Sequence, residues 1–323
     1  MVSGVVMLIA SFLPFFKIGA EGLKEDLSWS AWSNALSLFP LATISVLLVI
    51  ALAVQVAVAR FSGAALPERV AGFGWPQIRL LVGVLVTLTM LAYLFRSFGE
   101  DSDATASHGI GNYLAVLAGI GVIAGALMER SSSPASSGAD PASGAAGGVT
   151  PGDWVLMASG VVLLIGSFLT VVGSDGGEYG VADSNAWGEG YFPLFVLPAL
   201  LGVVVAVVAA LQAFTGAHLP DRVLGVSWRE IDLSFAGWAA LMMICFLIGK
   251  LVFEFELDDF DIPAGFESQV SESDIPQVEA SREVGFWVML IASLGLSAGA
   301  FMRYRLPGRE AGAPPPPPPP PPA

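Results

Sequence analysis

Eight apolar stretches constrain the fold of this chain more than any other feature of its sequence. Each is about 15 to 23 residues long, and a helix of that length, rising 1.5 Å per residue, can cross roughly 30 Å of hydrocarbon. Charged residues make up only 13% of the chain, whereas soluble domains contain about 25%. The sequence therefore predicts an integral membrane protein with spans at Val2–Phe16, Leu38–Ala59, Ile78–Phe95, Ile110–Met128, Trp154–Val172, Phe192–Phe214, Leu233–Phe253 and Val284–Met302.

Each stretch is expected to be a helix, because lipid offers no partners to backbone polar groups, and the predicted fold class is all-α and polytopic. The first stretch is the shortest and admits three interpretations: a signal-peptide core, a tilted or thinned span, and a span that truly starts upstream of Met1. No basic residue precedes it, and Leu13-Pro14-Phe15-Phe16 is a poor cleavage context, which argues against a signal peptide. We expect a span with a trimmed or misassigned start.

An internal repeat organises the chain. Residues 4–13 match residues 160–169 closely, and from Phe39 to Leu80 the matching residues are separated by a constant offset of 153. Four spans per copy is an even number, so both copies are expected to cross in the same direction around a pseudo-twofold axis along the membrane normal. The predicted domains are a first four-helix repeat at 1–128 and a second at 153–303. A flexible Ser/Gly/Ala/Pro linker at 129–152 joins them, and a Pro-rich tail follows at 304–323.

Lysine and arginine in the short loops predict the orientation. Loops after even-numbered spans hold nine of these residues when the tail is included, and loops after odd-numbered spans hold five. Both termini are therefore expected in the cytoplasm, and the bias toward Arg, Ala, Gly, Val and Pro is typical of GC-rich bacteria. Most acidic residues, and with them the net charge of −14, fall on the outer loops, a surface that would repel nucleic acid.

Two glycine pairs predict close helix packing. Gly121 and Gly125 lie four residues apart in the fourth span, and Gly295 and Gly299 repeat this spacing in the eighth. Two glycines at this spacing let a neighbouring backbone approach closely. We expect these helices to pack either on each other or each within its own repeat.

Aromatic and basic residues at the span ends are expected to anchor the chain to the lipid bilayer. Tryptophan prefers the membrane interface, and arginine in a loop can face lipid headgroups. The predicted anchors are Trp75, Trp228, Arg69 and Arg222 at the inner side and Trp32 and Trp187 at the outer side.

Few polar residues fall inside the spans. Arg79, Asp232 and Lys250 lie at span ends, where their side chains can reach the interface. Gln55 and Gln212 occupy the same face of the paired helices, which suggests a hydrogen bond between the two repeats. No catalytic, cofactor or metal motif is present, and the two histidines have no acidic neighbours at ligand spacing.

Two segments could contact a protein partner. The seventh loop, residues 254–283, is acidic and longer than its counterpart in the first repeat, and Phe253–Leu257 alternates like a strand. Pro314–Pro322 is a run of nine prolines, which forms a stiff extended helix that can dock on aromatic grooves. Each segment is alternatively a solvated region without a fixed partner.

Ser11-Phe12-Leu13-Pro14-Phe15-Phe16, with Ser30-Ala31-Trp32 and Phe39-Pro40 after it, resembles a family of uncharacterised multi-pass membrane proteins of actinobacteria. The resemblance implies no known activity and therefore no functional residues. We expect a non-enzymatic envelope scaffold or regulatory protein. The alternative is a transporter or channel for ions or small molecules, which the repeat favours and the lack of buried charge opposes.

Overall fold

A computed structural model describes residues 1–20, 27–34, 38–62, 66–67, 69–70, 72–96, 104–132, 149–174, 183–188, 191–215, 220, 222–249 and 280–305. The described residues are mostly helical, and seven helices are long and apolar enough to cross a membrane. The eight α-helices are α1 (Val2–Phe12), α2 (Thr43–Phe61), α3 (Trp75–Leu94), α4 (Ile110–Ser132), α5 (Pro151–Phe168), α6 (Val196–Phe214), α7 (Trp228–Ile248) and α8 (Val284–Arg305). A short π-helical segment, η1 (Leu38–Ala42), leads into α2.

Helix α1 is shorter than the span predicted at Val2–Phe16. Its 11 residues cover about 17 Å, roughly half of the hydrocarbon thickness. The helix ends at Phe12 because Leu13 precedes a proline and takes an extended conformation, with φ −83° and ψ 156°. The predicted end at Phe16 is wrong, since Phe16 begins a strand.

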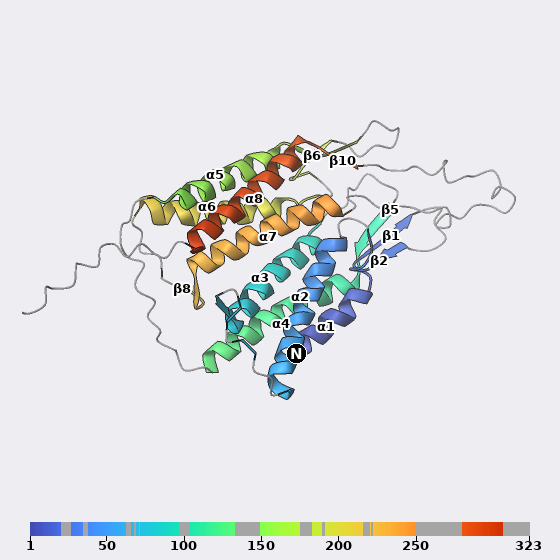
Figure 1. Cartoon of the computed structure of the whole chain (residues 1–323). Coiled ribbons are helices and arrows are strands. Elements are labelled where there is room, and N and C mark those ends of the chain that lie inside the picture. Colours follow the sequence, from blue (N-terminus) through green and yellow to red (C-terminus); the bar gives the residue numbers. More distant parts are fainter. Residues whose placement is uncertain are drawn as a thin grey trace, which may run out of the picture.

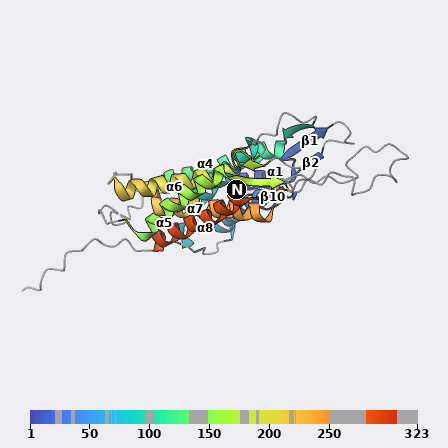
Figure 2. The ribbon, with the colours of Figure 1, turned by 90° about the horizontal axis from the view of Figure 1, so that it is seen from above.

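The helices form two groups that lie side by side (Figure 1). In the first helix group, α1 packs on α2 and α4, and α3 packs on α4; in the second helix group, α5 packs on α6 and α8, and α7 packs on α6 and α8. Helices α3 and α7 contact each other where the groups meet. Seen from above, the helices run along one shared direction (Figure 2).

Each helix group also has a three-stranded antiparallel sheet at one end, which the all-α prediction missed. In the first group β1 (Phe16–Ala20) pairs with β2 (Leu27–Trp29) and with β5 (Ala104–His108). In the second group β6 (Thr170–Ser174) pairs with β7 (Ser184–Asn185) and β10 (Ala280–Arg282). Strands β1, β2 and β5 extend beyond the helices at the right in Figure 1.

The opposite end of each group has a two-stranded hairpin between its second and third helices. These hairpins are β3 (Arg69–Val70) with β4 (Phe73–Gly74) and β8 (Arg222–Val223) with β9 (Val226–Ser227). Gly72 turns the first hairpin with a φ of 88°, a left-handed conformation that suits glycine. The ring of Tyr304, in the last turn of α8, stacks on Phe73 with 5.9 Å between centroids, so the final helix of the chain touches the first helix group.

The core continues across the contact between the two groups. Phe195 and Phe246 stack at 4.1 Å within the second group, and the indole nitrogen of Trp238 on α7 donates to Thr89 Oγ1 on α3 at 3.0 Å. Gly249, after α7, lies so close to η1 that a Cβ there would be 2.7 Å from the Phe39 carbonyl oxygen. The described residues of the two groups therefore form one packed body. The predicted strand at Phe253–Leu257 and the tail Pro314–Pro322 lie outside the described residues.

Candidate functional site

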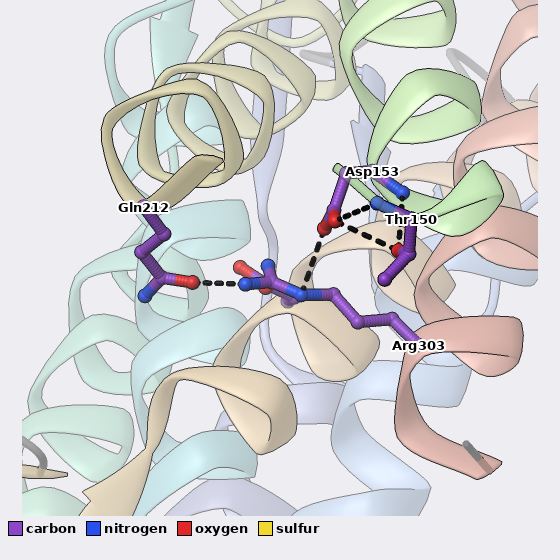
Figure 3. A network of polar contacts seen from close by, with 5 residues as sticks. Thr150, Asp153, Gln212 and Arg303 are labelled. Atoms are coloured by element: carbon purple, nitrogen blue, oxygen red, sulfur yellow. Dashed lines mark hydrogen bonds and ion pairs between the residues drawn. The ribbon is translucent and has the colours of Figure 1, made fainter. Parts of the chain in front are cut away.

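The most charged cluster inside the helices lies at the hairpin end of the second helix group (Figure 3). Arg303 on α8 points between three neighbouring helices. Its Nε lies 3.1 Å from Asp153 Oδ1 on α5, its Nη1 donates to Asp232 Oδ2 on α7 at 2.6 Å, and its Nη2 donates to Gln212 Oε1 on α6. We call Thr150, Asp153, Gln212, Asp232 and Arg303 the Arg303 network. This network joins all four helices of the second group.

Thr150 and Asp153 fix one corner of the Arg303 network. They form a capping box at the start of α5, in which Asp153 Oδ2 accepts from the Thr150 backbone N–H at 2.9 Å and from its hydroxyl at 2.7 Å. The Thr150 hydroxyl in turn accepts from the Asp153 N–H at 3.2 Å. The two donors of Thr150, the guanidinium and the N-terminus of α5 thus all meet at the Asp153 side chain.

Burial makes the ionic contacts of this network strong. The side chains of Arg303, Asp153 and Asp232 are 15%, 11% and 1% exposed. We expected the Asp232 side chain to reach the membrane interface, but it lies inside the helix group instead. The Oδ1 atoms of Asp232 and Asp153 are both buried and have no hydrogen-bond partner, which is unusual for buried carboxylate oxygens.

The first helix group contains a related cluster, named the Arg79 network. Arg79 at the start of α3 donates from Nε and Nη2 to Gln55 Oε1 on α2, at 3.2 and 2.8 Å, and pairs with Glu129 on α4. Asp232 lies 153 residues after Arg79, and Arg303 lies 174 residues after Glu129, the offset that also separates Met302 from Met128. The same two helix positions thus carry an ion pair in each group, with the charges exchanged.

The networks also replace the predicted hydrogen bond between Gln55 and Gln212. Each glutamine accepts from an arginine of its own helix group. A guanidinium is the stronger donor, because charge-assisted hydrogen bonds are roughly twice as strong as neutral ones. The two groups are instead joined at this end by the amide of Gln77, which donates to Glu230 Oε2 at 3.2 Å.

We predict that exchanging the two charges of the Arg79 network will be tolerated. Arg79→Glu or Glu129→Arg alone should each lower the free energy of unfolding by about 1 kcal/mol, because like charges then meet. The double variant copies the polarity of Asp232 and Arg303 and should recover most of the loss. Unfolding in mild detergent would measure this cycle, and strictly additive losses would contradict the prediction.

The glycine pairs lie within their own groups. A Cβ on Gly121 would meet Ser3 Oγ at 2.6 Å, and one on Gly295 would meet Ser159 Oγ at 2.8 Å, so α4 faces α1 and α8 faces α5. At Gly299 the contact is with backbone, since the Leu156 nitrogen of α5 lies 3.0 Å from such a Cβ. Gly125 differs, since nothing lies within 4 Å of a Cβ built there.

The four tryptophans proposed as interface anchors also bond within the protein. Trp75 and Trp228 donate to the carbonyl oxygens of Pro67 and Pro220, at 2.8 and 2.9 Å, and so brace the two hairpins. Trp32 and Trp187 donate to Ser11 and Ser167 at 3.1 and 3.0 Å. Arg69 and Arg222 are exposed in the first strands of their hairpins. Contact of these residues with lipid stays a prediction.

The sheet end contains a second group of polar residues, which lies apart from both networks in sequence and fold. Arg96, just after α3, is buried beneath the ring of Tyr191 at 5.9 Å. Burial lowers the pKa of Arg96 to about 10, an effect that electrostatic interaction with Tyr191 and Tyr93 partly offsets. Burial also lowers the pKa of Arg282, which donates to the Gly249 carbonyl oxygen at 2.8 Å and closes the end of α7.

Seven apolar helices of membrane-crossing length define the class of this chain, a multi-pass helical membrane protein. Comparisons with models of protein families, with curated proteins and with solved structures find no match. The resemblance to actinobacterial membrane proteins stays a prediction. The part of the chain that the structure describes has no cluster of three or more His, Cys, Asp or Glu side chains that could hold a metal ion.

Proposed function

We propose that the chain is a non-enzymatic membrane scaffold or regulatory protein, built from two parallel four-helix repeats that cross the membrane eight times. Matching contacts support the repeat. A side chain on Gly4 in α1 would collide with Ala53 in α2, and one on Gly160 in α5 would collide with Ala206 in α6. Since α1 occupies the place in its group that α5 occupies in the other, the short helix would be the eighth crossing, tilted or in a thinned bilayer.

The loop charges support the proposed orientation. The hairpins, with exposed Arg69 and Arg222, lie at the same end as the Arg303 network and the end of α8. Arginine-rich short loops remain on the cytoplasmic side of bacterial membranes. This orientation places both termini and the tail Pro314–Pro322 in the cytoplasm of a bacterium and the loop 254–283 outside.

One observation carries the scaffold proposal: the two arginines inside the described helices, and the indole of Trp238, bind neighbouring helices. Arg303 joins four helices of one group, Arg79 joins three of the other, and Trp238 bonds to Thr89 between the groups. Bonds of this kind fix the helices in place, whereas a transport path needs polar groups that a solute can reach. A rigid body of this kind suits a protein that presents fixed surfaces to its partners.

The second candidate function is transport of an ion or small molecule. One feature favours it: among the described residues, the Arg303 network holds two carboxylates and one guanidinium. Excess buried charge in a membrane helix often marks an ion or proton pathway.

Purification from the native membrane in mild detergent tests the scaffold against the transporter. We expect the full chain to retain a protein partner that is lost when Pro314–Pro322 or the acids of loop 254–283 are replaced by Gly/Ser of equal length. A matched replacement within residues 133–148 of the linker should change nothing. A chain that stays alone and moves ions across liposome membranes would overturn the scaffold in favour of the transporter.

A further inference from the structure

We propose that the Arg303 network is a proton-binding site, in which Asp232 Oδ1 holds one proton at neutral pH. The inference rests on the geometry of the network and does not depend on the scaffold function. Two carboxylates, Asp153 and Asp232, share the single guanidinium of Arg303, so the network without a proton has one negative charge in excess.

Such an excess is costly at this position. Asp232 lies in the second turn of α7 with a side chain only 1% exposed, and an uncompensated charge in a low-dielectric interior tends to be neutralised. The charged side chains that act on Asp232 are Arg303 and Asp153, and the third neighbour, Gln212, is neutral. Two carboxylates that share one site bind a proton more readily than either would alone.

The hydrogen bonds indicate which carboxylate holds the proton. Asp153 accepts from the Thr150 N–H and hydroxyl on Oδ2 and faces the Arg303 Nε with Oδ1. Asp153 thus has two hydrogen bonds on Oδ2 and an ion pair on Oδ1, although its Oδ1 has no hydrogen-bond partner. Asp232 accepts from Arg303 on Oδ2, while its buried Oδ1 has no hydrogen-bond partner. The ion pair of Asp232 uses Oδ2, whereas that of Asp153 uses Oδ1, so a proton on Asp232 Oδ1 removes charge without displacing a donor.

A proton fits this site better than a metal cation. Cations such as Ca²⁺ need about six to eight oxygen ligands and Mg²⁺ needs near-octahedral geometry. Here Asp153 Oδ2 and Asp232 Oδ2 accept hydrogen bonds from Thr150 and Arg303, respectively, and Asp153 Oδ1 faces the Arg303 Nε, so few oxygen ligands are left for a metal. A proton adds no volume and leaves a neutral set of one guanidinium, one carboxylate and one carboxyl.

Infrared spectroscopy of the full-length protein in lipid nanodiscs, with isotope-labelled aspartate, tests the proposal. At pH 7 we expect the carbonyl band of one protonated aspartic acid per chain, and we expect Asp232→Asn to abolish it. Asp153→Asn should also abolish it, because removing the second negative charge lets Arg303 and Asp232 form a balanced pair. A purely structural role for Asp153 would leave the band in place.

Glu129→Gln is the matched control, since it removes the acid of the Arg79 network and should leave the band unchanged. Thermal unfolding of each variant shows whether it is folded. If Asp232→Asn does not fold, the proposal is still tested by two spectra: the band must be present in the unmodified chain and absent in Asp153→Asn. The proposal is overturned by the absence of a protonated aspartic acid at pH 7, or by a band that persists in folded Asp232→Asn or Asp153→Asn.

Discussion

Replacement of Arg303 by methionine is expected to lower the free energy of unfolding by roughly 3–5 kcal/mol, the cost of breaking a buried ion pair by removing one partner. Methionine keeps most of the side-chain volume, so the loss comes from the charges. It leaves Asp153 and Asp232 buried without their shared counter-ion and takes the donor from Gln212. Reversible unfolding in mixed detergent micelles would measure the change.

Two further variants separate charge from packing. Arg79→Met removes the equivalent cation of the first helix group, but its partner Glu129 is 44% exposed, so the expected loss is only about 1 kcal/mol. Adding Asp153→Asn and Asp232→Leu to Arg303→Met removes all charge from the network and should recover much of the stability. Equal losses for Arg303→Met and Arg79→Met would contradict our description of the Arg303 network.

Substitution of isoleucine at Gly299 is expected to destabilise the second helix group by about 1–3 kcal/mol, the usual cost of overpacking a well-filled contact. A Cβ at Gly299 would meet the Leu156 backbone nitrogen at 3.0 Å and the Gly152 carbonyl oxygen at 3.2 Å. Backbone atoms cannot rotate away as a side chain can, so α5 and α8 must separate. Thermal unfolding in detergent would report the loss.

Gly125 provides a matched control at the same point of the first group, since the offset of 174 residues that relates Met128 to Met302 also relates it to Gly299. Nothing lies within 4 Å of a Cβ built on Gly125, so Gly125→Ile should have little effect or raise stability slightly through helix propensity. The measured quantity is the difference in unfolding midpoint between Gly299→Ile and Gly125→Ile. Similar unfolding midpoints would show that α8 is not held closely against α5.

Hydropathy predicted the long helices well because a membrane span is a local property of 20 or so residues. The two sheets could not be predicted in this way. Strand β1 pairs with β5, which lies more than 80 residues later in the chain, and neither strand exceeds five residues. Local alternation over so few residues is too weak a signal when the pairing is set by the helices between the strands.

The Arg303 network was missed although the sequence contained its signal. The spacing of Thr150 and Asp153 is that of a capping box, and the repeat offset pairs Arg79 with Asp232. We interpreted Asp232 as a residue at a span end because hydropathy alone does not show which side of a helix faces its neighbours. The sequence also could not predict the hydrogen-bond partner of Gln55 or Gln212, because that partner depends on the distance between helices and not on the repeat.

The contact of Tyr304 with Phe73 has a consequence for the order of assembly during synthesis. Bacterial and eukaryotic ribosomes add about 5–20 residues per second, so the chain between these residues takes roughly 10 to 50 s to make. Throughout that time the first hairpin lacks the aromatic ring that covers it in the finished protein. The first hairpin therefore gains this ring only after α8 has been made, and a chain truncated before α8 would leave Phe73 without it although every residue of the first group is present.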